Sequence, residues 1–225
     1  MLKLIFLVLF VLKDSEAVIH SIDDTPINTI FHNYNKYARA STDDSPVNVT
    51  YSMSIRRIVG FDTKRLVVHA WNVMTWKDPR LVWQGGPSTV HLPPSEIWTP
   101  DIVCYNNPIT TSTYEPNTVV RRNGAVHYVP VTKLDTDDCK FVNVIIECKF
   151  KVGSWTYNGN ELNIEATSET IDMDDYIPND IYEIVNSKVQ RNITKYACCP
   201  EPYITLDYIL HLKPKQQFQQ WFPWS

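Results

Sequence analysis

The sequence has no long apolar run after its first 12 residues and no excess of positive charge. A helix that spans a bilayer needs about 20 consecutive apolar residues, so the rest of the chain predicts no such helix. The 21 Lys and Arg residues are outnumbered by 25 Asp and Glu residues, and we find no basic patch of the kind that binds nucleic acid. The formal net charge of −4 favours cationic partners instead.

The first 17 residues, MLKLIFLVLFVLKDSEA, have the pattern of a secretory signal peptide. Lys3 precedes an apolar run from Leu4 to Leu12, and the small-residue ending predicts cleavage after Ala17. This run is itself too short to span a bilayer. The sequence therefore predicts a secreted, extracellular protein.

Two sequons, at Asn48 and Asn192, are candidate glycosylation sites in a secreted chain. Sequons also occur often by chance, so unmodified asparagines are the alternative at both positions. The chain shows no G-x-S-x-G, no H-E-x-x-H and no nucleophile beside a base. We therefore expect no enzyme activity and no cofactor; the alternative is a secreted hydrolase.

Five cysteines cannot all pair within one chain, although a secretory compartment permits disulfides. We expect Cys139 to pair with Cys148 and Cys198 with Cys199, which leaves Cys104 outside both pairs. Cys104 ends an apolar run and is expected to be a small buried hydrophobe; a reactive thiol is the alternative. Zinc is a weaker use for these cysteines, because no C-x2-C pattern or paired histidine spacing accompanies them.

The adjacent pair Cys198 and Cys199 lies in KYACCPEPY (195–203). A disulfide between neighbours closes almost no loop, and consecutive Cα atoms lie closer together than is usual for bridged cysteines. Such a pair is a poor structural staple, so the sequence predicts a local function for it. Two reduced thiols in a loop are the alternative.

Strand patterns dominate the chain, and helical periodicity is convincing only between residues 24 and 39. Asn123-Gly124 predicts a two-residue hairpin turn. Many short strands about 10 residues apart, without an internal repeat or domain break, predict one β-sandwich. The expected strand segments are 48–59, 65–76, 119–129, 140–155, 161–166, 188–196 and 203–212.

The sequence is rich in aromatic residues, with seven Trp and twelve Tyr. Trp155 ends a strand pattern, Tyr105 lies in a loop, and Tyr196 and Tyr203 flank the paired cysteines. If the fold brings these four together, they form an electron-rich box that holds quaternary ammonium groups by cation–π attraction. In the alternative, they are core or strand-surface residues, as most aromatic residues in a β-sandwich are.

The motifs WNVMTWKDPRLVW (71–83), IWTPDIVCYNN (97–107), VGSWTYNG (152–159) and YACCPEPY (196–203) occur in this order. Through them the sequence resembles the extracellular domain of the Cys-loop (nicotinic acetylcholine) receptors, and more closely the soluble acetylcholine-binding proteins. The resemblance covers about residues 25–212. It implies a short N-terminal helix and a ten-strand immunoglobulin-like β-sandwich, assembled as a ring of five.

After the signal peptide (1–17), which the N-terminal pattern predicts, the resemblance implies a ligand-binding domain (18–212) followed by a C-terminal tail (213–225). It implies that acetylcholine or a nicotine-like cationic amine binds between subunits, under a hairpin tip stiffened by the vicinal disulfide. One chain would supply both faces, so a homopentamer suffices. The principal face would comprise Tyr105, Trp155, Tyr196, Cys198, Cys199 and Tyr203. The complementary face would comprise Trp71, Val119, His127 and Val129.

One loop departs from the family pattern. The family has twelve or thirteen residues between the two cysteines of its signature loop, whereas CKFVNVIIEC (139–148) has eight and lacks the aromatic-Pro-aromatic-Asp tip. In receptors this tip meets the membrane domain, so its absence fits a binding protein without a channel. The alternatives are the extracellular domain of a pentameric ligand-gated channel subunit and a pentamer that binds another ligand.

His127 has two interpretations, an outward strand residue without ligand contact or a residue that lines the pocket. Imidazole changes its charge between about pH 5 and 8. If His127 lines the pocket, its protonation would repel a cationic ligand, so binding of a quaternary amine should weaken as the pH falls. An affinity that is flat from about pH 8 to 5.5 would remove His127 from the site.

Overall fold

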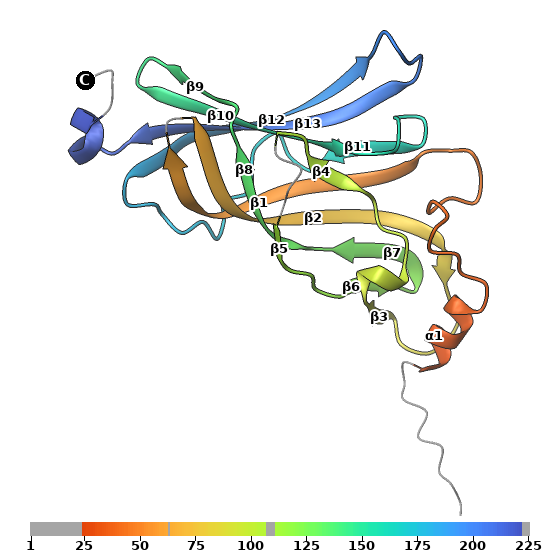
Figure 1. The fold of residues 1–225 in the computed structure, drawn as a ribbon. Helices are drawn as coiled ribbons and strands as arrows, with labels where there is room; N and C mark the ends of the chain where they lie inside the picture. The colour runs from red at the N-terminus through yellow and green to blue at the C-terminus, as the bar shows by residue number, and fades with distance from the viewer. Residues whose placement is uncertain (1–23, 63, 107–110, 222–225) are drawn as a thin grey trace, which may run out of the picture.

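The computed structural model describes residues 24–62, 64–106 and 111–221. The predicted signal peptide (residues 1–17) lies outside these ranges. A short helix, α1 (Asp24–Phe31), precedes two β-sheets stacked face to face along their length (Figure 1). A 3₁₀ turn, η1 (Pro94–Glu96), lies within the sandwich segment, and a second, η2 (Gln216–Trp221), lies in the predicted tail.

These elements confirm the predicted all-β sandwich with a short N-terminal helix. The described residues form thirteen separate strands where the resemblance implies ten, because edge segments of three or four residues count as strands of their own. The strands are β1 (Val47–Asp62), β2 (Arg65–Val82), β3 (Thr89–Leu92), β4 (Ile102–Cys104), β5 (Thr111–Tyr114), β6 (Thr118–Arg121), β7 (Asn123–Tyr128), β8 (Val131–Thr136), β9 (Cys139–Val142), β10 (Ile145–Ser154), β11 (Leu162–Ala166), β12 (Tyr182–Lys195) and β13 (Pro202–Pro214).

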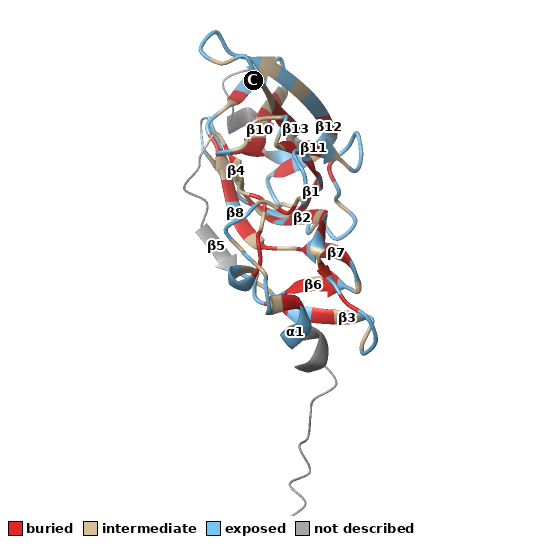
Figure 2. Cartoon of the chain, turned by 90° about the vertical axis from the view of Figure 1, so that its right-hand side faces the viewer, coloured by how far each residue is buried: buried red, intermediate tan, exposed pale blue. Residues whose placement is uncertain are grey.

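The first sheet has the order β11-β1-β2-β7-β6-β3, with β8 paired to β2 and to β5. The second has the order β12-β13-β10-β4, with β9 paired to β10. Buried and more exposed residues alternate along β2 and β10, as the period of a strand requires when one face packs on a core. Residues coloured as buried lie on strands of both sheets (Figure 2), and their side chains form one hydrophobic core cluster.

The core joins the two sheets through apolar packing and through a buried hydrogen bond between β13 and β1. Met53 of β1 and Phe150 of β10 are fully buried. The Tyr208 hydroxyl of β13 donates to the Tyr51 carbonyl of β1 at 3.0 Å, and the two rings pack edge to face. This contact fixes the middle of β13 on the first third of β1.

Helix α1 ends at Phe31, so the predicted helical segment is eight residues too long at its C-terminal side. Asn35 explains the early end. Its carbonyl accepts the Ala38 N–H at 3.2 Å, and its side-chain oxygen accepts the Tyr37 N–H at 3.0 Å. Asparagine side chains compete with helical hydrogen bonds in this way and favour turns.

The hairpin between β6 and β7 is confirmed, but its predicted two-residue turn is wrong. The pairing of β6 with β7 ends at Val120 and Val126, and of Asn123 and Gly124 only Gly124 has positive φ, at 81°. Arg122 bonds elsewhere: its N–H donates to Ser88 O at 2.9 Å. Gly124 is required here, because a Cβ would collide with the Asp78 carbonyl.

Candidate functional site

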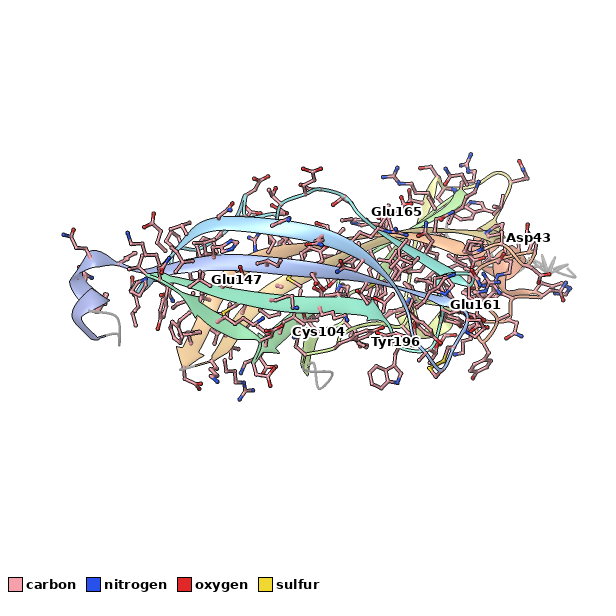
Figure 3. All side chains as sticks on the ribbon, turned by 90° about the horizontal axis from the view of Figure 1, so that it is seen from above. Asp43, Cys104, Glu147, Glu161, Glu165 and Tyr196 are labelled. Carbon is pink, nitrogen blue, oxygen red and sulfur yellow. A yellow bond between two sulfur atoms is a disulfide. The ribbon has the colours of Figure 1, made fainter. Side chains whose placement is uncertain are left out.

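Four aromatic side chains, Tyr105, Trp155, Tyr196 and Tyr203, together line one cavity of ≈ 220 Å³. Tyr105 follows β4, Trp155 follows β10, and the two other tyrosines lie at the tip of the β12–β13 hairpin. Figure 3 shows Tyr196 far along the molecule from the C-terminal η2. The fold therefore brings together the four residues that the sequence predicted as an aromatic box.

Tyr105 and Trp155 pack edge to face, with ring centroids 6.2 Å apart and an interplanar angle of 77°. The Tyr105 hydroxyl donates to the Ser154 carbonyl. Gly153 makes this approach possible, because a Cβ at this position would lie 2.7 Å from the Tyr105 hydroxyl oxygen. Burial raises the pKa of Tyr105 to about 12, so the hydroxyl remains a neutral donor at physiological pH.

Asp101 positions the turn that carries Trp155. Its backbone carbonyl accepts the Trp155 N–H at 3.1 Å. Its carboxylate accepts the Ser154 hydroxyl at 2.5 Å, the Thr156 N–H at 2.7 Å and the Thr156 hydroxyl at 2.6 Å. Asp101 thus bonds the residues on both sides of Trp155, and the turn holds the indole, which is 65% exposed, at the surface.

This role of Asp101 was not predicted from the sequence, although Asp101 lies within the motif IWTPDIVCYNN (97–107). The signal was a carboxylate after Pro100 that had no assigned partner. Its partners, Ser154 and Thr156, lie more than 50 residues away in the sequence, and only the pairing of β4 with β10 brings them near.

The hairpin tip presents Tyr196 and Tyr203 as a pair, with ring centroids 5.4 Å apart and an interplanar angle of 63°. Strand pairing between β12 and β13 ends at Lys195 and Pro202. Beyond it the Cys199 N–H donates to the Tyr196 carbonyl at 3.1 Å. Cys198 and Cys199 form a disulfide at this turn.

The residues proposed for the complementary face line a second cavity, of ≈ 300 Å³. Trp71, 38% exposed on β2, forms one wall, and the His127 side chain is exposed on β7. The Nδ1 atom of His127 lies 3.2 Å from the Thr75 hydroxyl oxygen. The lining residues are Trp71, Tyr114, Pro116, Asn117, Val119, His127, Val129 and Val131.

Sequence reasoning missed Tyr114 in this second cavity. Tyr114 is 64% exposed and pairs with Val131, which is beside Trp71 in the sheet. An aromatic residue at the end of a short polar strand was the signal. Its register with β8, which places it near Trp71, depends on tertiary pairing that local sequence does not specify.

The two aromatic cavities have no lining residue in common. A single chain therefore assembles each predicted face but does not bring the two faces together.

The remaining predicted positions also have defined surroundings. Cys139 and Cys148 form a disulfide that joins β9 to β10, and Cys104 is buried at 3% exposure (labelled in Figure 3). The Asn48 side-chain oxygen accepts a hydrogen bond from Asn163, and that of Asn192 accepts one from Gln190. Within the described ranges, no three His, Cys, Asp or Glu residues are grouped to hold a metal ion.

A two-sheet sandwich, with a vicinal disulfide in the hairpin tip whose two tyrosines line an aromatic cavity, defines a class of ligand-binding domain. The chain belongs to the neurotransmitter-gated ion-channel ligand binding domain family, whose model matches residues 23–215. This family is described by ligand binding and is not an enzyme family.

Relatives of the chain are nicotinic acetylcholine receptor subunits. Acetylcholine receptor subunit alpha-type acr-16 of Caenorhabditis briggsae is 36% identical over 82% of this chain and 40% of its own length. Neuronal acetylcholine receptor subunit alpha-9-I of Oncorhynchus mykiss is 31% identical over 85% of this chain and 36% of its own. Neuronal acetylcholine receptor subunit alpha-9 of Homo sapiens is 30% identical over 85% of this chain and 43% of its own length.

The chain therefore spans less than half the length of these relatives. The matched part corresponds to the ligand-binding domain of the family. None of the helices in the described ranges has the length and apolar character needed to cross a membrane.

Proposed function

We propose that the chain binds acetylcholine or a related cationic amine without catalysis, at sites between copies of itself. The principal face would comprise the aromatic box with Cys198 and Cys199. The complementary face would comprise Trp71, Val119, His127 and Val129 of the next copy. The relatives that are named as acetylcholine receptor subunits support this choice of ligand.

The observation that carries the proposal is the cavity whose four lining residues are all aromatic. Aromatic faces attract a quaternary ammonium by about 2 kcal/mol or more when the site is desolvated. A cavity of ≈ 220 Å³ suits a small ammonium group, and its open side leaves room for a second wall.

The assembly that we propose is a homopentamer with five equivalent sites, secreted after removal of residues 1–17. Residues 18–212 would form the binding domain and residues 213–225 a tail. Asn48 and Asn192 would be the glycosylation sites of this extracellular protein. The shortened loop between Cys139 and Cys148 supports the absence of coupling to a channel.

A second candidate is the extracellular domain of a pentameric ligand-gated channel subunit. The observation that favours it is the length of the relatives, of which this chain matches only 36–43%. A full-length transcript separates the two candidates, because a channel subunit requires four apolar spans downstream of the binding domain.

The experiment that tests binding is a titration of the purified chain with acetylcholine, followed by tryptophan fluorescence. We expect saturable quenching that Trp155→Ala abolishes. Tyr37→Ala is the control, because Tyr37 is 87% exposed and does not line the cavity. No response at millimolar acetylcholine from a folded assembly would contradict the proposal, and release of choline would contradict the absence of catalysis.

A further inference from the structure

Trp71, which lines the second cavity, already has a cation against its indole ring. The guanidinium carbon of Arg56 lies 4.1 Å from the ring centroid. Arg56 is not among the residues that line the cavity, so it covers a part of the ring other than the part that the cavity exposes. A ligand at this wall therefore meets an indole that an internal cation already engages.

The backbone directs Arg56 to this position. The pairing of β1 with β2 has a bulge between Ile55 and Arg57, so Arg56 has no partner residue in the ladder. The Arg56 carbonyl accepts the Ile177 N–H at 2.8 Å. Its guanidinium forms an ion pair with Asp175 at 2.7 Å. The segment 175–177 thus holds Arg56 at both its backbone and its side chain.

The charge of Arg56 is only partly balanced. The Asp175 side chain is 67% exposed, whereas that of Arg56 is 22% exposed. Solvent weakens an ion pair with so exposed a carboxylate. A ligand cation on the cavity side, within about 6 Å of the ring, would lie within about one Debye length of the guanidinium. The two cations would repel each other across the indole.

We propose that Arg56 determines the charge specificity of the site, an inference that rests on the proposed function. Arg56 makes the Trp71 wall reject a positive charge. The ammonium group then binds at the box around Trp155, and the neutral end of the ligand lies against Trp71 and the apolar Val119 and Val129. The site therefore accepts monocationic amines with a neutral tail and discriminates against bis-quaternary ligands.

The test compares two probes on the full chain: acetylcholine, and a dication with trimethylammonium groups at both ends of a ten-carbon chain. Arg56→Met removes the charge and keeps a long stem. We expect it to raise the affinity for the dication relative to acetylcholine by about 3–10-fold, the range for two charges at this separation in a partly aqueous medium. Arg56→Lys keeps the charge, so it should stay within about twofold of the wild-type ratio.

Arg57→Met is the matched control, because Arg57 is the next residue, is exposed and pairs with His69 rather than Trp71. It removes the same formal charge from the chain. The proposal would be overturned if Arg56→Met kept the wild-type ratio of dication to acetylcholine affinity, or if Arg57→Met changed this ratio equally.

A second measurement separates this inference from the proposed function. Collisional quenching by caesium and by iodide, taken as the difference from the corresponding Trp71→Phe protein, reports the local charge at Trp71 without a ligand. We expect Arg56→Met to increase caesium quenching and decrease iodide quenching. An unchanged ratio overturns the inference even if acetylcholine binds; a changed ratio supports it even where the absence of acetylcholine binding contradicts the proposed function.

Discussion

Tyr105 can occupy its position only because Gly153 has no side chain. In Gly153→Ala the new Cβ would lie 2.7 Å from the Tyr105 hydroxyl oxygen and 3.0 Å from the adjacent ring carbon. The ring must shift, and its hydrogen bond to Ser154 is lost. We expect acetylcholine affinity to fall about tenfold, which corresponds to about 1.4 kcal/mol.

Gly60→Ala is the matched control for this substitution. No atom lies within 4 Å of the Cβ that it would add, and Gly60 does not have positive φ. Calorimetric titration of both variants should show wild-type affinity for Gly60→Ala only. Equal affinities in both variants would mean that Tyr105 does not need its observed position.

Tyrosine burial predicts a loss of stability in alkali. Burial, followed by the nearby Tyr196, raises the pKa of Tyr105 from 10.0 to about 12. Between these values the unfolded chain has lost the proton and the folded chain has kept it, so the free energy of unfolding falls as the pH rises. Below about pH 10 the contribution of Tyr105 is fully present.

Burial raises the pKa of Tyr208 and Tyr51 as well, so the wild-type decline above pH 10 is a sum of contributions. Tyr105→Phe should make the decline between about pH 10 and 12 less steep without removing it. Urea unfolding at stepped pH measures the slope. A slope identical to that of the wild type would show that the folded state does not hold Tyr105 in its neutral form.

At the scale of elements, the two disulfides differ in what they constrain. Cys139 and Cys148 are nine residues apart and close a loop between β9 and β10, whereas Cys198 and Cys199 are adjacent. Loop closure predicts a loss of about 2–3 kcal/mol in the free energy of unfolding when both Cys139 and Cys148 become Ser, and under about 1 kcal/mol for the vicinal pair.

Acetylcholine affinity should depend on the two disulfides in the opposite order, with the larger loss for the vicinal pair. The double Ser variant of Cys198 and Cys199 leaves the sandwich intact but frees the tip that carries Tyr196, so acetylcholine affinity should fall. Each double variant is the control for the other, with denaturant unfolding and ligand titration measured on both. Loss of stability from the vicinal pair without loss of affinity would contradict this assignment.

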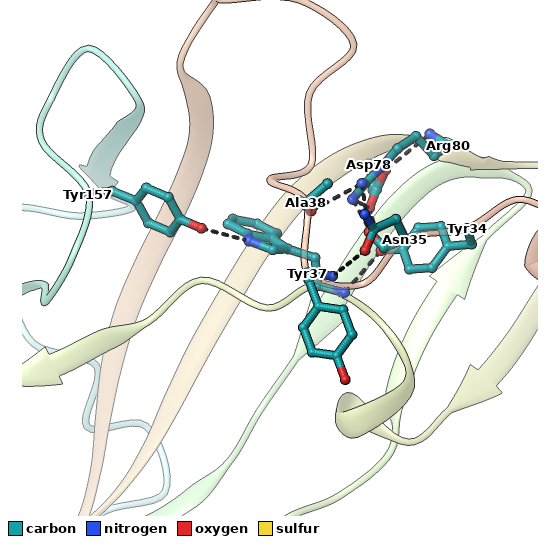
Figure 4. A network of polar contacts seen from close by, with 8 residues as sticks. Tyr34, Asn35, Tyr37, Ala38, Asp78, Arg80 and Tyr157 are labelled. Carbon is teal, nitrogen blue, oxygen red and sulfur yellow. Dashed lines mark hydrogen bonds and ion pairs between the residues drawn. The ribbon is translucent and has the colours of Figure 1, made fainter.

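Hydrogen bonds that start at a buried carboxylate connect the N-terminal segment with the turn that carries Trp155 (Figure 4). Asp78, fully buried, accepts the Tyr34 hydroxyl at 2.7 Å and pairs with Arg80 at 2.7 Å. The Tyr34 hydroxyl oxygen in turn accepts the Trp98 N–H at 3.0 Å. The Trp98 indole donates to the Tyr157 hydroxyl, two residues beyond Trp155, at 3.3 Å.

Asp78→Ala should therefore lower the free energy of unfolding by about 3–5 kcal/mol, because it leaves the Arg80 charge without its buried partner. Asp44→Ala is the control, since Asp44 is exposed in the loop before β1. Thermal and urea unfolding check the difference. Equal stability of the two variants would show that the hydrogen bonds of Asp78 do not stabilise the N-terminal segment.

The sequence predicted those elements whose pattern is local. It did not predict features whose conformation depends on a residue far away in the sequence. Alternation in residues 65–76 located the start of β2, which continues to Val82. The β6–β7 turn could not be predicted, because the backbone of Arg122 bonds to Ser88, 34 residues earlier. The four aromatic residues of the box were found because each is an aromatic residue in a motif, whereas Asp101, which also lies in a motif, and Tyr114 act through tertiary pairing.

For the whole molecule, the central feature is the separation of the two aromatic cavities on one chain. In the proposed assembly each cavity supplies one wall of the site, and neither cavity is lined by residues of the other. Closed rings with identical contacts between neighbours bring two different surfaces of one chain together at every interface. The account therefore predicts that binding is a property of the assembly and that no single chain has a complete site.

The most direct measurement is complementation between two defective chains. Trp155→Ala removes the principal face and Trp71→Ala removes the complementary face, so each variant assembled alone should bind acetylcholine weakly. In assemblies formed from an equal mixture, about a quarter of the interfaces combine two intact faces, and we expect acetylcholine sites of wild-type affinity to reappear in that proportion. A mixture that assembles to wild-type size without regaining such sites would contradict a site shared between two copies.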